Sequence, residues 1–120
     1  MEREAWRVLI VEDDAGRREA LAECVASLGV EVATASGPGE GLAAARSGPR
    51  PDAILLDLFM PRLEGHPLLA ALAGDGSLSD VPVVAMTSGR GRSQIPVRAR
   101  LRKSYDLDEL AKVLVRLGAC

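Results

Sequence analysis

The sequence predicts an α/β fold in which a parallel sheet is covered by helices on both faces. Strand-like and helix-like segments alternate along the chain, strand then helix three times, followed by two strands and a last helix. The segments at residues 53–56 and 81–86 are almost continuously apolar, which is typical of strands buried on both faces. Alternation at this spacing predicts βαβ units, whose strands run parallel.

The totals fit one compact domain spanning residues 1–120, because the chain has 120 residues and 48% hydrophobic content. The net charge of -2 and the pI of about 5.4 give no indication of a nucleic-acid or membrane partner. No apolar run is long enough to span a bilayer, and the acidic N-terminus does not resemble a signal peptide. Two cysteines, Cys24 and Cys120, are too few for a disulfide framework, so we expect free thiols in a reducing cytosol.

The first strand is expected at residues 6–11 and runs into the acidic cluster Glu12-Asp13-Asp14. A helix over residues 15–28 follows, with Asp14 as its N-cap and Gly29 as its C-terminal stop. The apolar residues of this helix form one stripe at helical spacing. That stripe consists of Ala20, Leu21, Cys24, Val25 and Leu28.

Residues 30–73 predict a strand, a helix, a further strand and a further helix. Residues 30–35 alternate between apolar and polar, as a strand near a sheet edge does. An alanine-rich helix is expected over residues 39–46. Residues 53–56 predict a buried strand that runs straight into Asp57, and a third helix is expected over residues 67–73.

The last third begins with a buried strand, residues 81–86, which ends at Thr87-Ser88. Residues 89–96 hold two glycines and a proline without an apolar stripe, which indicates a loop. Residues 97–103 alternate with period two and predict a fifth strand with one basic face. The final helix, residues 106–117, is amphipathic, with its acids first and its bases last, as the helix dipole prefers.

Charged and hydroxyl side chains follow the predicted strands where each strand ends. The set consists of Glu12, Asp13, Asp57, Thr87 and Lys103. Because the carboxyl ends of parallel strands lie at one edge of a sheet, these side chains should converge in one crevice. Clustered carboxylates need a cation, and Mg²⁺ suits oxygen ligands. A carboxylate nucleophile beside a metal, a hydroxyl and an ammonium is arranged for phosphoryl transfer.

Each of these signals also has a plain structural interpretation when it is taken alone. The acidic triplet Glu12-Asp13-Asp14 fits a solvated turn, and Asp57 fits a strand-end cap. Thr87 fits a helix cap or turn, and Lys103 fits a surface lysine. Their joint placement at strand ends, rather than their residue types, favours a site.

The chain resembles the receiver domains of two-component response regulators over essentially its whole length. Residues 8–14 match the family's first strand and acidic cluster, and residues 57–61 match its phosphoacceptor segment. Residues 86–88 match the strand end that carries the switch hydroxyl, and Lys103 matches the family's lysine. The resemblance implies a flavodoxin-like, doubly wound sheet of five parallel strands in the order 2-1-3-4-5.

The resemblance implies that Asp57 accepts a phosphoryl group from a histidine kinase or a histidine phosphotransfer protein. It also implies a Mg²⁺ site made by the side chains of Asp57, Glu12 and Asp13 and by the backbone carbonyl of Phe59. Asp14 is the less favoured member of the acidic cluster for this role.

The resemblance further implies that the phosphoryl group is contacted by Thr87, Ser88 and Lys103. Three departures from the family pattern concern this part of the chain. Ser104 stands where the family has a proline after the lysine, and Arg100 stands where it has an aromatic switch residue. Lys103 stands only 16 positions after Thr87, several fewer than usual. We therefore expect the family's fourth helix to be absent or reduced to a turn.

Basic residues concentrate in the same region, with no acid from residue 90 to residue 103. Besides Lys103, the set consists of Arg90, Arg92, Arg98, Arg100 and Arg102. It is interpreted either as a solvated basic face of an edge strand or as a docking surface for an acidic partner. His66, the one histidine, is expected in a surface loop.

The leading hypothesis is a phosphoacceptor signalling module without an effector domain, which is not an enzyme and acts through an altered protein–protein contact. We expect a cytoplasmic monomer or weak dimer with a downstream protein target and no direct contact with nucleic acid or membrane. The alternative is a phosphorylation-independent interaction domain, similar to a pseudo-receiver, that keeps the pocket but lacks the switch. A phosphatase with an aspartate nucleophile is disfavoured, because Phe59 stands where such enzymes carry a second aspartate.

Overall fold

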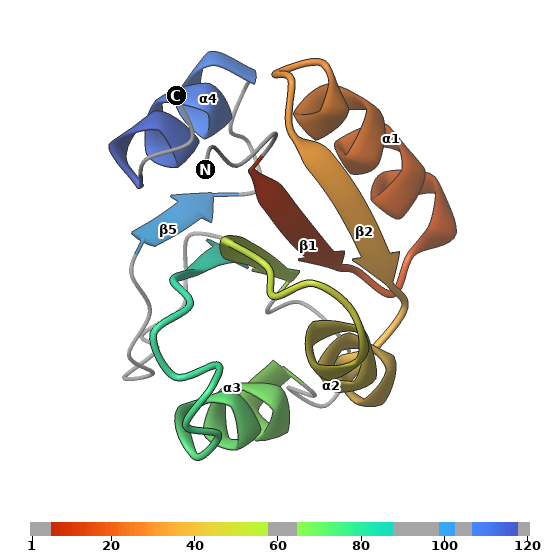
Figure 1. Ribbon diagram of the computed structural model, residues 1–120. Helices are drawn as coiled ribbons and strands as arrows, with labels where there is room; N and C mark the ends of the chain where they lie inside the picture. Colours follow the sequence, from red (N-terminus) through yellow and green to blue (C-terminus); the bar gives the residue numbers. More distant parts are fainter. Residues whose placement is uncertain (1–5, 58–64, 88–98, 103–106, 118–120) are drawn as a thin grey trace.

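The computed structural model shows a five-stranded parallel sheet in the order β2-β1-β3-β4-β5, flanked by helices (Figure 1). It describes residues 6–57, 65–87, 99–102 and 107–117, and the side chains at positions 57, 65–67, 69, 87, 99–102 and 107 lie outside that description. The strands are β1 (Arg7–Val11), β2 (Glu31–Ala35), β3 (Ala53–Asp57), β4 (Val83–Thr87) and β5 (Ala99–Arg102). The helices are α1 (Ala15–Ala26), α2 (Pro38–Ser47), α3 (Gly65–Ala73) and α4 (Leu107–Arg116). The predicted fold class and strand order are confirmed.

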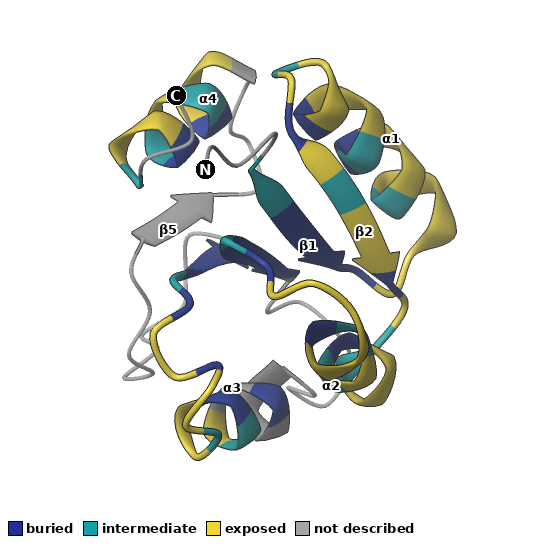
Figure 2. Ribbon diagram, viewed as in Figure 1, coloured by how far each residue is buried: buried dark blue, intermediate teal, exposed yellow. Residues whose placement is uncertain are grey.

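The sheet divides the core into two clusters, because successive side chains of a strand point to opposite faces. On one face, Leu9 and Ile54 pack with Leu68 and Leu72 of α3 and with Ala45 of α2. On the other face the strand residues that follow Leu9 and Ile54 in the chain pack against α1 and α4. That second cluster includes Val8, Ile10, Leu55, Val84, Leu21, Val25, Leu110 and Leu114. Figure 2 shows the inner strands buried between the two helix layers.

Helix α1 begins at the predicted N-cap. Asp14 has extended backbone angles, and its carboxylate accepts a hydrogen bond from the backbone N–H of Arg17 at 2.8 Å. The predicted apolar stripe was too wide, because Leu21 and Val25 are buried whereas Ala20 and Cys24 are exposed. A step of one residue turns a helix by about 100°, so residues one place before the buried pair face solvent.

Three element boundaries differ from those expected by two residues, and several others differ by one. Helix α1 ends at Ala26 and is followed by a turn, in which Gly29 has a φ of 89°. Helix α3 starts at Gly65 rather than at residue 67. Strand β4 starts at Val83 because Pro82 has no N–H for the ladder, although the Pro82 carbonyl accepts from Ile54 at 3.0 Å.

Strand β2 forms one edge of the sheet, as its alternating pattern predicted. The expected loop over residues 89–96 and the expected loss of a helix there lie outside the described residues. The strand expected over residues 97–103 is present as β5, whose described part is Ala99–Arg102. Within the described ranges, no helix is both long and apolar enough to cross a membrane.

Candidate functional site

The backbone register brings the predicted site positions to one edge of the sheet. Val11, the last residue of β1, pairs with Leu56 of β3, so Glu12 and Asp57 are the next positions on two adjacent strands. Asp57 in turn pairs with Met86, and Thr87 follows as the last residue of β4. These are the carboxyl ends of parallel strands, where α/β sheets bind their ligands.

Among the side chains that the structure describes at this edge, Glu12 is the buried polar one, with 2% of its surface exposed. Its backbone N–H extends the ladder by donating to the Ala35 carbonyl at 3.0 Å, which fixes the residue against β2. Its carboxylate oxygen Oε2 accepts the backbone N–H of Asp14 at 3.1 Å and lies 3.6 Å from Nε of Arg17. A carboxylate buried to this extent requires such partners, because desolvation strongly disfavours its charge.

The other two acids of the cluster have different roles. Asp13 is exposed and makes no hydrogen bond or ion pair with the described part of the chain. The carboxylate of Asp14 is engaged in capping α1. The capping role of Asp14 is compatible with the predicted choice of Glu12 and Asp13 as the acids of the site, which stays a prediction.

Carboxylate oxygens from adjacent strand ends are the hard donors that Mg²⁺ takes in proteins, so the residue types at this edge fit that ion. Within the described residues no group of three or more His, Cys, Asp or Glu side chains is close enough to hold a metal. The side chain of Asp57 and the whole of Phe59 lie outside those residues.

Comparison with known proteins agrees with the fold. The family model of the response regulator receiver domain matches residues 8–114. The chain belongs to this family. Response regulator MprA of Mycobacterium tuberculosis is 38% identical over 82 residues, which are 68% of the chain and 34% of the relative. Protein PilH of Pseudomonas aeruginosa is 34% identical over 82 residues, covering 68% of the chain and 67% of the relative.

The matched segment is a different share of each relative's own length. The receiver domain described here spans about a third of the length of MprA. A receiver-like segment also occurs in a kinase, since sensor histidine kinase CheAY of Helicobacter pylori is 30% identical over 82 residues, covering 68% of the chain and 10% of the relative.

Solved structures of receivers superpose closely on this one. Chemotaxis response regulator CheY4 of Vibrio cholerae has a TM-score of 0.83 at 26% identity, covering 94% of this chain and 98% of that one. The receiver domain of sensor histidine kinase PA1611 of Pseudomonas aeruginosa has a TM-score of 0.86 at 25% identity, covering 95% and 98%. The latter is described with a magnesium ion coordinated in its active site cleft.

Several predicted site residues of this receiver domain lie outside the described part of the chain. They are Phe59, Ser88, Arg90, Arg92, Arg98 and Lys103. The backbone still locates their neighbours, since Arg102, which precedes Lys103, pairs with Thr87. Arg100 also lies in β5, where it pairs with Ala85. His66 was expected in a loop but lies in the first turn of α3, because the helix starts at Gly65 and not at Pro67 as expected.

Sequence reasoning missed two arginines beside the acidic cluster of the receiver. Arg17 forms the ion pair with Glu12, and Nη1 of Arg18 donates to the Glu12 carbonyl at 3.0 Å. The available signal was the N-cap at Asp14, which places the first turn of α1 directly over the end of β1.

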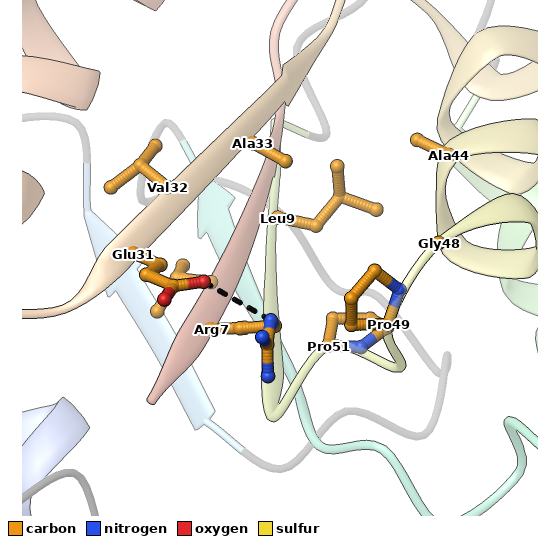
Figure 3. A pocket seen from close by; sticks show the side chains of 10 residues that line it. Arg7, Leu9, Glu31, Val32, Ala33, Ala44, Gly48, Pro49 and Pro51 are labelled. Atoms are coloured by element: carbon orange, nitrogen blue, oxygen red, sulfur yellow. Dashed lines mark ion pairs between the residues drawn. The ribbon is translucent and has the colours of Figure 1, made fainter. Parts of the chain in front are cut away.

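A pocket of about 250 Å³ lies at the opposite edge of the sheet, near the amino-terminal ends of β1 and β2 (Figure 3). The Arg7–Glu31 ion pair, with 3.1 Å between Nε and Oε1, lies at its side. The small residues Ala33, Ala44 and Gly48 leave the hollow between β2 and the end of α2. Its position separates it from the acidic edge, so the pocket is not part of the predicted phosphoacceptor site.

Proposed function

We propose that this receiver domain is a phosphoacceptor module of a two-component or phosphorelay system, with Asp57 as the phosphorylated residue. The observation that carries the proposal is the register of β1 on β3, which makes Glu12 and Asp57 adjacent positions at the carboxyl edge of the sheet. The burial of Glu12 supports it, because buried ionisable groups are concentrated at functional sites.

In the proposed reaction the Asp57 carboxylate attacks the phosphorus of a phosphohistidine. The new P–O bond forms as the P–N bond breaks, and the leaving imidazole nitrogen takes up a proton. Glu12, Asp13, Asp57 and the Phe59 carbonyl would hold Mg²⁺, which when bound supplies charge that neutralises the phosphoryl oxygens. Thr87, Ser88 and Lys103 would donate hydrogen bonds to the transferred group.

The proposed donor is a histidine kinase or a histidine phosphotransfer protein, and the proposed output is a changed contact with a downstream protein. The module would act stoichiometrically rather than as a turnover enzyme, in the cytoplasm where ATP-dependent kinases work. The relatives support the donor class, because they include a response regulator and a sensor histidine kinase.

The test is the intact mass of the protein after incubation with acetyl phosphate, with and without Mg²⁺. The expected result is a gain of one phosphoryl group that requires Mg²⁺ and is absent in Asp57→Asn. Asp52→Asn serves as the matched control, because Asp52 lies at the amino-terminal side of β3, where its Oδ2 accepts from the Arg7 N–H at 2.7 Å. An adduct that persists in Asp57→Asn would contradict the assignment.

A second candidate function is a phosphorylation-independent interaction domain, and Arg100 is the observation that favours it. Its backbone lies in β5, at a position where receivers carry an aromatic switch residue. An arginine side chain cannot be buried as an aromatic ring can, because its guanidinium is charged. Amide spectra before and after phosphorylation separate the two candidates, since this second function predicts changes confined to the neighbours of Asp57.

A further inference from the structure

Two groups at the start of α1 contribute to the charge compensation of the Glu12 carboxylate. With 2% of Glu12 exposed, its charge is largely removed from water. Its oxygen Oε2 accepts a hydrogen bond from the Asp14 backbone N–H and forms an ion pair with the guanidinium of Arg17. The side chain of Arg17 is 59% exposed, so its charge reaches the buried acid from the solvent side of the site.

The position of Arg17 in its helix is unusual. It is the third residue of α1 after the N-cap Asp14, and the first turn of this helix contains no acid. The positive end of a helix dipole disfavours a cation there. The ion pair with Glu12 offsets that cost and explains how an arginine is accommodated at this position.

Arg18 has a separate role. Its Nη1 donates to the backbone carbonyl of Glu12 at 3.0 Å, which holds the peptide that joins Glu12 to Asp13. This contact leaves the carboxylate itself untouched. The two arginines therefore have different contacts: Arg18 holds the backbone of Glu12, and Arg17 pairs with its carboxylate.

We propose that Arg17 is a positioning residue that acts as a counter-ion for Glu12 when no metal is bound and thereby weakens Mg²⁺ binding. This rests on the proposed function, in which Glu12 is part of the metal site. A cation already paired with a ligand oxygen repels a divalent ion and competes for that oxygen. On metal binding the exposed guanidinium of Arg17 can turn into water, so the competition sets affinity without blocking the site.

The test is a calorimetric titration of the metal-free protein with Mg²⁺ for wild type and three variants. Arg17→Gln removes the counter-ion, and we expect it to bind Mg²⁺ about threefold to tenfold more tightly. Arg17→Lys keeps the charge and should stay within about twofold of wild type. Arg116→Gln changes the net charge equally in the last turn of α4, away from the carboxyl edge, and should leave the affinity unchanged.

Folding is checked for every variant by urea unfolding, followed through the fluorescence of Trp6. Equal Mg²⁺ affinities for Arg17→Gln and Arg116→Gln, or no Mg²⁺ binding by any variant, overturn the inference even when Asp57 is phosphorylated. Tighter binding by Arg17→Gln in a protein that acetyl phosphate does not modify keeps the inference and overturns the proposed function. The two failures are therefore distinguishable.

Discussion

At the scale of single residues, Asp75 shows how a loop carboxylate can join two helices. Its Oδ1 accepts the hydroxyl of Ser77 at 2.7 Å and the Ser77 backbone N–H at 3.0 Å. Its Oδ2 accepts Nε of Arg46, in the last turn of α2, at 3.0 Å. These donors, the Ser77 hydroxyl first and Arg46 second, hold the pKa of Asp75 below its ordinary value.

The sign of the pH dependence follows from that direction. Because the pKa of Asp75 is lower in the folded chain than in the unfolded one, its ionised form stabilises the fold above the unfolded pKa. That contribution is lost as the pH falls through the folded pKa. We expect Ser77→Ala to raise the Asp75 pKa towards its ordinary value, measured by NMR titration of the carboxyl carbon.

Ser79→Ala is the control for this titration, since Ser79 is exposed in the same turn and bonds to the Asp75 carbonyl through its backbone. It should leave the pKa of Asp75 where it is. An Asp75 pKa that does not respond to Ser77→Ala would show that the hydroxyl is not the main cause of the shift.

Residue roles could be predicted from sequence where they depend on neighbours in the chain. The cap at Asp14 is local and was predicted, and so was the placement of Glu12 and Asp13 after a buried strand. The pairing of Arg46 with Asp75 joins residues 29 apart and depends on how the end of α2 meets the turn after α3. The pairing of Arg17 with Glu12 depends on the angle at which α1 leaves β1. Neither pairing has a periodic signal.

At the scale of elements, helix α2 approaches β1 through Gly41. A Cβ placed at Gly41 would lie 3.0 Å from Cγ2 of Val11, a fully buried and β-branched side chain. Val11 cannot move aside readily, because its χ1 is restricted and its surroundings are packed. The glycine is therefore required by contact rather than by its backbone angles.

We expect Gly41→Ala to destabilise the fold by about 1 kcal/mol, because overpacking outweighs the gain of about 1 kcal/mol in helix propensity. Gly39→Ala in the same helix is the matched control, since a Cβ at Gly39 would meet no other atom within 4 Å. That variant should be more stable than wild type, by up to about 1 kcal/mol. Urea unfolding of both variants measures the contrast, and equal stabilities would contradict it.

Element types were predictable because apolar runs and helical stripes are properties of short segments. The residues at which elements begin and end were harder to predict, as α1 and β4 show. The stripe of α1 was drawn too wide because alanine and cysteine are apolar enough to count in a pattern, yet Ala20 and Cys24 face solvent. The buried face of a helix is decided by how the helix packs against the sheet, and the sequence of the helix alone does not determine that packing.

At the scale of the whole molecule, the two edges of the sheet differ in character. The carboxyl edge carries the acidic residues of the proposed site. The amino edge carries the pocket that Ala33, Ala44 and Gly48 leave open. The order of the strands was expected from the resemblance to receivers, but the pocket could not be predicted, because it arises from small residues on elements that meet only in the folded chain.

Filling the pocket should therefore change stability without changing the site. We expect Ala44→Leu to stabilise the fold by about 0.5–1 kcal/mol, because Ala44 lines the hollow and already packs against the core. Ala43→Leu, at an exposed neighbouring position of α2, should give no such gain. Urea midpoints measure the stabilities, and Mg²⁺ titration should give the same affinity for both variants. A shift in that affinity with Ala44→Leu would show that the two edges are coupled.

The pairing of Val8 with Ala53 has a consequence for how the chain folds. These two residues are neighbours in the sheet but belong to strands separated by α1, β2 and α2. Closing so long a loop costs conformational entropy before the contact between the strands forms. We therefore expect β1 to pair with β3 after the local helices have formed. Since the same pairing sets Glu12 beside Asp57, the acidic edge and the centre of the sheet should appear in a single kinetic step. Partly folded chains that lack β3 would then have no phosphoacceptor site.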